Sequence, residues 1–118
     1  ERTKNNTGVT FNIALNYGGR AEIVNAARLA AAAVSERQIT VEDITEEYFG
    51  GLMYTSNLPE VDLIIRPSGE KRLSNFLLWQ AAYAEFWYSD ICWPDFTSKD
   101  MEQAIIDYQN RDRRFGRI

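Results

Sequence analysis

The chain has 118 residues, of which 45% are hydrophobic and 25% are charged, so it belongs to the ordinary globular class and amounts to one small domain. Its formal net charge of −4 argues against nonspecific binding to nucleic acid. Cys92 is the single cysteine and histidine is absent, which excludes an internal disulfide and leaves oxygen ligands for any metal, favouring Mg²⁺ or Ca²⁺. The sequence shows no charged-then-apolar leader and no apolar run of membrane-spanning length, so we expect a soluble, cytoplasmic protein.

The first half of the chain predicts one strand and two helices. Residues 9–17 alternate apolar with small or polar side chains, as in a strand, and a sharp turn at Gly18-Gly19 follows. Apolar residues then recur at helical spacing, which predicts a long, alanine-rich helix with one face on a sheet; the positions are Ile23, Val24, Ala27, Ala30, Ala31 and Val34. Thr40 and Asp43 are spaced as a capping box, so a short helix should run from there to Gly50-Gly51.

The second half predicts two more strands and two more helices. Apolar residues 61–65 indicate a buried strand, and residues 85–91 indicate another. Residues 75–84 are apolar on nearly every side, which predicts a helix covered all round, either by a partner subunit or by the same domain. Thr97 and Asp100 form a capping box that should begin the last helix, with a buried stripe at Met101, Ala104, Ile105 and Tyr108. This order implies an α/β fold with a parallel sheet, flanking helices and a site at the carboxyl ends of the strands.

A dense set of hydrogen-bond donors follows the strand at residues 61–65. It consists of Arg66, Ser68, Lys71, Arg72 and Ser74, with one acid among them. An ordinary solvated loop is the alternative, but forked arginine donors suit phosphate and favour an anion site. Glu85 closes the apolar segment after this loop, where a carboxylate must either pair with an arginine or hold a cation. The arginines of residues 111–117 indicate a solvated helix end or a ligand site.

Three separated motifs resemble those of the cis-prenyltransferases, and of the undecaprenyl diphosphate synthase family in particular. They are Asn16-Tyr17-Gly18-Gly19-Arg20, the run Arg66-x-Ser-Gly-Glu-x-Arg72-x-Ser74-Asn-Phe-Leu-Leu-Trp-Gln with Ala-Tyr-Ala-Glu85-Phe after it, and the terminal Arg114-Phe115-Gly116. The resemblance implies an enzyme that condenses isopentenyl diphosphate onto an allylic diphosphate, farnesyl diphosphate, with Mg²⁺ as cofactor. Its product would be a long-chain polyprenyl (undecaprenyl) diphosphate.

The resemblance also implies roles for individual residues. Arg66, Arg72 and Ser74 would grip the diphosphate of isopentenyl diphosphate, while Arg114 and Gly116 would reach toward the substrate site of a partner subunit. Glu85 would help to hold Mg²⁺, and Val9 would line the floor of a hydrophobic tunnel that limits product length. Residues 75–86 would form much of a homodimer interface.

Two departures from the family pattern limit this interpretation. Pro67 stands where many relatives carry threonine, and the Asp-Gly-Asn-Gly-Arg motif that supplies the catalytic aspartate is absent. We therefore expect residues 1–118 to be the carboxyl-terminal portion of a single cis-prenyltransferase domain, inactive when alone. The alternatives are a non-catalytic subunit or inactive fragment with a diphosphate-binding and dimerisation role, or an unrelated phosphate-binding α/β module. Product length and peripheral membrane association of the intact enzyme stay open.

Overall fold

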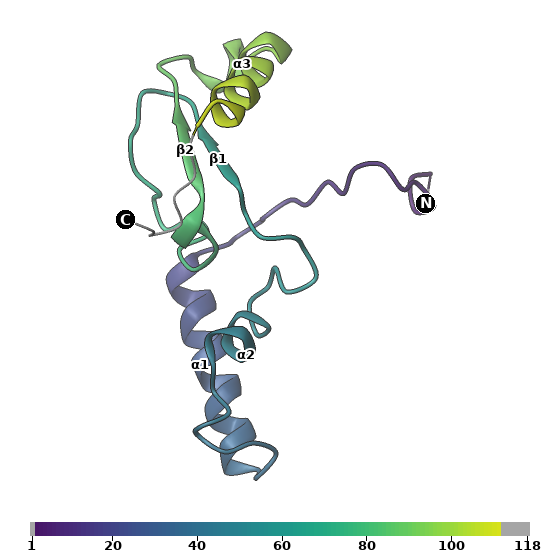
Figure 1. Ribbon diagram of the computed structural model, residues 1–118, viewed down its shortest axis with the longest axis vertical. Coiled ribbons are helices and arrows are strands. Elements are labelled where there is room, and N and C mark those ends of the chain that lie inside the picture. The colour runs from purple at the N-terminus through teal and green to yellow at the C-terminus, as the bar shows by residue number, and fades with distance from the viewer. Residues whose placement is uncertain (1, 112–118) are drawn as a thin grey trace.

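The computed structural model describes residues 2–111, and its helices and strands lie in three groups along one direction (Figure 1). The elements in chain order are α1 (Gly19–Ser35), α2 (Glu46–Gly50), β1 (Leu63–Arg66), the 3₁₀ helix η1 (Gln80–Tyr83), β2 (Glu85–Tyr88), the 3₁₀ helix η2 (Trp93–Asp95) and α3 (Ser98–Gln109). The pair α1 and α2 lies at one end, the strands lie in the middle and α3 lies at the other end.

The strands β1 and β2 form a parallel pair, in which Ile64 stands opposite Phe86 and Arg66 opposite Tyr88. This confirms the α/β class and two of the three predicted strands. Because side chains alternate along a strand, Phe86 and Tyr88 share one face, and their rings stack at a centroid distance of 5.9 Å. On the other face, the Trp87 indole N–H donates to the carboxylate of Asp107 in α3 at 2.8 Å. The helix α3 therefore covers one face of the sheet.

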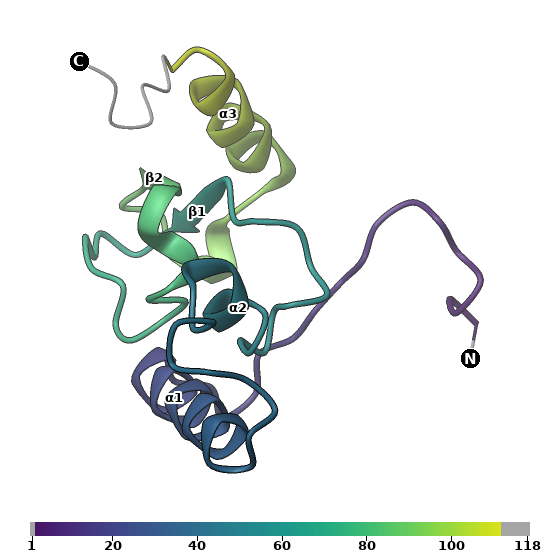
Figure 2. The same ribbon diagram turned by 60° about the horizontal axis from the view of Figure 1, so that its bottom comes forward.

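The predicted strand over residues 9–17 is wrong. The segment has no regular secondary structure and extends away from the helices and strands in both views (Figures 1 and 2). Its alternate apolar residues are exposed, at 91% for Val9, 85% for Phe11, 62% for Ile13 and 82% for Leu15. A strand needs a hydrogen-bonded neighbour, and none of the described residues lies beside this segment as one.

The helix α1 is confirmed, but its buried face differs from the predicted one. The buried residues are Gly19, Glu22, Ala26, Ala30 and Ala33, so Ala30 alone of the six predicted positions is buried. Val24 is 49% exposed. The prediction assumed a sheet as the packing partner, whereas α1 packs against the short helix α2 and the turn at Tyr54, whose N–H donates to Glu22 at 2.7 Å.

The two capping boxes have different outcomes. Thr40 donates to Asp43 through its N–H at 2.7 Å and its hydroxyl at 2.9 Å, but these bonds close a turn, and α2 begins later, with Thr45 as its N-cap. The box of Thr97 and Asp100 begins α3 as predicted. Of the predicted α3 stripe, Ala104 is fully buried, while Met101 and Ile105 are 46% and 43% exposed.

The predicted helix over residues 75–84 is also wrong, since the structure forms only the short helix η1 there. Ser74, Asn75 and Leu77 have φ angles of 48°, 66° and 47°, which a right-handed helix does not allow. The bend at Asn75 serves α1, because its backbone carbonyl accepts from the Gly19 N–H at 2.7 Å and its side-chain oxygen accepts from the Arg20 N–H at 2.8 Å. A distant loop residue thus caps the start of α1.

The arrangement is more open than a compact domain of this length. The radius of gyration is 17.5 Å, against about 13 Å for a compact chain of similar size. The extended amino-terminal segment accounts for part of this difference (Figure 2). Within residues 2–111, no helix combines the length and the apolar character that crossing a bilayer requires.

Candidate anion-binding site

The loop that leaves β1 is fixed at its base by backbone hydrogen bonds. Pro67 is fully buried, and Ser68 and Gly69 follow with φ angles of 77° and 70°. The N–H of Ser68 donates to the carbonyl of Ile91 at 2.7 Å, and that of Gly69 to the carbonyl of Ser89 at 2.8 Å. Both of these backbone donors are therefore already used and are not available to an anion.

Arg66 and Arg72 converge on the carboxylate of Glu70. Each donates through Nη2, Arg66 to Oε2 and Arg72 to Oε1. The arginine side chains are 24% and 64% exposed. The hydrogen bond from Arg66 is the main reason why the pKa of the Glu70 carboxyl lies below its usual range, and the charge of Arg72 adds to this effect. Two guanidinium groups therefore lie within reach of one anionic group, the carboxylate of Glu70 in the same loop.

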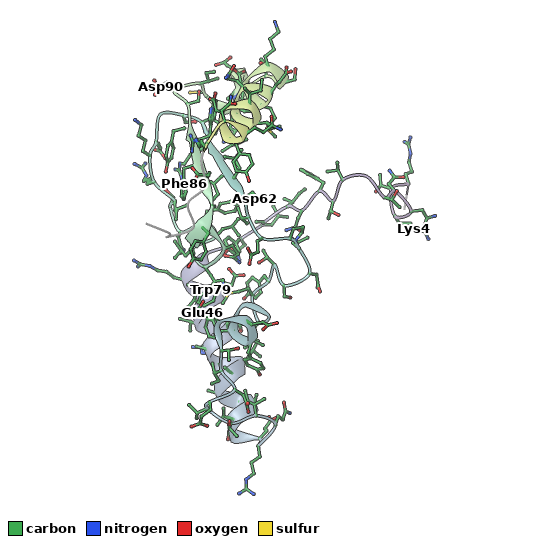
Figure 3. All side chains as sticks on the ribbon, viewed as in Figure 1. Lys4, Glu46, Asp62, Trp79, Phe86 and Asp90 are labelled. Carbon is green, nitrogen blue, oxygen red and sulfur yellow. The ribbon has the colours of Figure 1, made fainter. Side chains whose placement is uncertain are left out.

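These three side chains lie at a hollow of about 400 Å³, which we call the arginine pocket. Its lining includes Phe86, whose side chain lies on the sheet face opposite α3 (Figure 3). The rest of its lining is largely apolar and aromatic, with Ile64, Leu73, Phe76, Phe86, Tyr88 and Trp93 among it. A charged mouth beside apolar walls suits a ligand with an anionic head and a hydrocarbon tail.

Ser74 does not line the arginine pocket. It lies in a second hollow of about 360 Å³ with Arg20 and Asn75, and Leu73 borders both hollows. The prediction treated residues 66–74 as one continuous cradle, but the left-handed backbone at Ser74 turns its side chain toward the start of α1. Ser68 lines the arginine pocket instead, and its place directly after Arg66-Pro67 was the signal that pointed to it.

Glu85 pairs with an arginine, which is one of the two predicted alternatives. Arg111 donates through Nη1 to Oε2 of Glu85 at 2.7 Å and to the carbonyl of Phe86 at 2.9 Å. By strand alternation, Glu85 lies on the face of Trp87, away from Arg66. Within residues 2–111, no group of three or more potential metal-binding side chains gathers. These residues alone do not fit a Mg²⁺ site.

A buried carboxylate that the sequence analysis missed, Glu22, lies in the first turn of α1. Glu22 is fully buried and accepts from the Tyr17 hydroxyl, from the Tyr54 N–H at 2.7 Å and from Gln80 Nε2 at 3.1 Å. Burial, and then the hydrogen bond to Glu22, raise the pKa of the Tyr17 phenol above its ordinary value. The acid among small residues just after Gly18-Gly19-Arg20 was the available signal for this network.

Three predicted site residues lie outside both hollows or outside the described part of the chain. Val9 lines neither hollow and is 91% exposed, so the described residues form no tunnel floor around it. Arg114 and Gly116 lie outside the described residues.

The fold and the pocket together define an α/β protein with a pocket lined by two arginines at the carboxyl end of a parallel strand pair. A family model described as "Putative undecaprenyl diphosphate synthase" matches residues 1–116. The chain belongs to this family.

Individual relatives agree with the family match. The chain is 59% identical over 118 residues to an isoprenyl transferase of Clostridium perfringens, covering 100% of this chain and 47% of that protein. It is 50% identical over 116 residues to the ditrans,polycis-undecaprenyl-diphosphate synthase ((2E,6E)-farnesyl-diphosphate specific) of Micrococcus luteus, covering 98% and 47%. Lavandulyl diphosphate synthase from Lavandula x intermedia, solved in complex with dimethylallyl diphosphate, matches with a TM-score of 0.82 and 42% identity, covering 86% of this chain and 44% of that one. The chain thus spans about half the length of these relatives.

Proposed function

We propose that this chain supplies the isopentenyl diphosphate site of a cis-prenyltransferase. The observation that carries the proposal is the convergence of Arg66 and Arg72 on one carboxylate at the mouth of a largely apolar pocket. A diphosphate presents several anionic oxygens, so one guanidinium can bind each end of it. The apolar walls would then receive the isoprenoid part, whose burial is worth about 25 cal/mol per Å² of apolar area.

The reaction of the whole enzyme follows from the family and extends the proposal. Isopentenyl diphosphate would be condensed onto an allylic diphosphate, farnesyl diphosphate, and the allylic diphosphate would leave as the new carbon–carbon bond forms. Repetition would give a long-chain polyprenyl (undecaprenyl) diphosphate. In this chain, Arg66 and Arg72 would bind and neutralise the diphosphate that is retained.

Further parts of the proposal concern the intact enzyme. We place it in the cytoplasm as a homodimer that needs Mg²⁺, with residues 75–86 at the dimer interface. Arg114 and Gly116 would approach the substrate of the partner subunit, and Ser74 would act with Arg20 at the rim of the site. Glu85 would contribute to Mg²⁺ binding if its pair with Arg111 opens in the assembled enzyme.

Titration of isopentenyl diphosphate into the chain by calorimetry tests the binding site. Arg72→Ala should weaken binding about 10- to 100-fold, because a hydrogen bond to a charged group contributes about 1.5–3 kcal/mol. Arg28→Ala, which removes the same charge from the exposed side of α1, should leave the affinity unchanged. Equal effects of the two substitutions would reject the pocket as the binding site.

A transfer assay tests the catalytic part separately. The chain, incubated with labelled isopentenyl diphosphate, farnesyl diphosphate and Mg²⁺, should form no polyprenyl product alone. An intact enzyme that contains these residues should form it, and Arg72→Ala there should weaken isopentenyl diphosphate binding far more than farnesyl diphosphate binding. Transfer by the chain alone would overturn the division of roles.

A second candidate function is a diphosphate-binding and dimerisation role without catalysis. The pairing of Glu85 with Arg111 favours it, because a carboxylate paired with an arginine is not available as a ligand of Mg²⁺. If an assembly that contains the chain binds isopentenyl diphosphate but transfers nothing when its other parts are complete, this second function holds.

A further inference from the structure

The arginine pocket already holds an anion that belongs to the chain. The Glu70 carboxylate accepts one hydrogen bond from Arg66 and one from Arg72, using both of its oxygens. Its side chain is 40% exposed and lines the same hollow as the two arginines. The carboxylate therefore occupies the position between the guanidiniums that a phosphoryl group of a ligand would need.

We infer that Glu70 is a built-in competitor that occupies the two-arginine site when it is empty and must be displaced before a diphosphate binds. The inference rests on the proposed function. It assigns to Glu70 a role opposite in sign to that of a positioning residue, because a competitor lowers the affinity for the ligand and a positioning residue raises it.

The charges at the pocket support displacement over sharing. Two guanidiniums carry a charge of +2 and Glu70 supplies −1, so a surplus positive charge remains to attract a polyanion. A diphosphate placed between the same guanidiniums would lie against the Glu70 carboxylate, and like charges at such separations repel strongly in a half-buried site. Each guanidinium has N–H donors left over, so it is the repulsion between the two anions, with no cation between them, that favours displacement of Glu70.

The geometry of the loop makes such a displacement feasible. Ser68 and Gly69 are held by backbone hydrogen bonds to Ile91 and Ser89, so the base of the loop stays in place when a side chain above it moves. Glu70 itself reaches the arginines through a flexible side chain that is in part exposed. Because it is tethered next to its partners, it competes with an effective concentration in the millimolar range or higher.

The test measures the affinity of inorganic pyrophosphate by calorimetry in EDTA, so that no divalent cation bridges the two anions. Glu70→Gln keeps the volume and removes the charge, and it should bind pyrophosphate about tenfold or more tightly than the unmodified chain. Glu70→Ala should also bind more tightly, and added acetate should then compete with pyrophosphate, because it replaces the lost carboxylate. Glu102→Gln, which removes the same charge from an exposed position of α3, is the matched control and should change nothing.

The outcomes separate this inference from the proposed function. If the unmodified chain binds pyrophosphate while both Glu70 variants, folded by circular dichroism, bind equally or more weakly, Glu70 is a positioning residue and the competitor role is rejected. If none of the proteins binds pyrophosphate, the proposed site and the inference fail together. If Glu102→Gln bound pyrophosphate more tightly to the same degree, the change in net charge would explain the higher affinity. That result would also reject the inference.

Discussion

The buried carboxylate of Glu22, near the start of α1, accepts hydrogen bonds from both halves of the chain. Glu22 receives hydrogen bonds from Tyr17, from the backbone of Tyr54 and from Gln80, which come from three separate segments. Gln80 Nε2 also donates to Thr55 at 3.0 Å. A buried carboxylate is stable only when such donors surround it. The network therefore fixes α1 against the turn at Tyr54 and against η1, which carries Gln80.

Tyr17→Phe should make the stability of the chain less sensitive to alkaline pH. Burial and Glu22 raise the pKa of the folded Tyr17 phenol above 10.0, its ordinary value. The protonated phenol is thus favoured by folding, so its contribution to the free energy of unfolding is complete below about pH 10 and is lost as the pH rises toward the folded pKa. Urea unfolding should show a loss of stability between about pH 10 and pH 11 that the variant lacks.

Tyr83→Phe is the control for this experiment, because Tyr83 is 69% exposed. It should keep the alkaline loss of the unmodified chain. The same pH dependence in Tyr17→Phe and in the unmodified chain would contradict the assignment of the loss to Tyr17.

The anion site shows what residue chemistry predicts and what it does not. Forked donors at Arg66 and Arg72 predicted an anion site, and the structure brings the two side chains together on the carboxylate of Glu70. Binding of an external anion there stays a prediction. The same sequence run gave no sign that Ser74 would turn toward Arg20, because this depends on a left-handed backbone imposed by contacts with α1. The role of Glu70, the acid in this run, can be inferred only from the positions of the side chains in the structure.

At the scale of elements, the sequence correctly predicted the helices and strands that depend on interactions between residues close together in the chain. The α3 capping box and the strands at residues 63–66 and 85–88 follow from short sequence patterns. The predicted helix over residues 75–84 was wrong because a long-range interaction overrides the helical propensity of this segment. That interaction is the capping of α1 by Asn75. The predicted buried face of α1 was wrong because α1 packs against another helix and a turn and not against a sheet.

Gly19→Ala should destabilise the contact between α1 and this loop. A Cβ at Gly19 would lie 2.9 Å from Leu78 Cγ, 3.0 Å from the Leu78 backbone nitrogen and 3.2 Å from the Asn75 carbonyl oxygen. Two of these atoms are backbone and cannot move away independently, so a cost of about 1–3 kcal/mol is expected. Urea unfolding measures it.

Two other glycines give the comparison. A Cβ at Gly18 would meet the end of the flexible Asn75 side chain at 2.8 Å, so Gly18→Ala should cost less than Gly19→Ala. Gly8→Ala meets nothing within 4 Å and should be neutral within about 0.5 kcal/mol. If all three variants were equally stable, the close approach of the loop to α1 would carry no energetic weight.

At the scale of the whole molecule, much apolar surface is left uncovered. The parallel strand pair has only two members among the described residues, and the extended segment before α1 exposes its large apolar side chains at Val9, Phe11, Ile13 and Leu15. Alternation is the pattern of a half-buried strand, which is why the sequence predicted a strand here. Pairing itself is a property of neighbours, which a local pattern does not supply.

The extended segment should make the chain associate with itself. Phe11 and Leu15 are 85% and 82% exposed, and burial of such a side chain is worth about 1.5–3 kcal/mol. Sedimentation velocity should therefore show association that grows with concentration, and Phe11→Ser combined with Leu15→Ser should reduce it. Val41→Ser, which removes a 64% exposed apolar side chain from a different loop, should leave it unchanged. Equal association of all three proteins would show that the contact lies elsewhere. If the unmodified chain were a monomer at every concentration, this segment would not drive association despite its exposed apolar side chains.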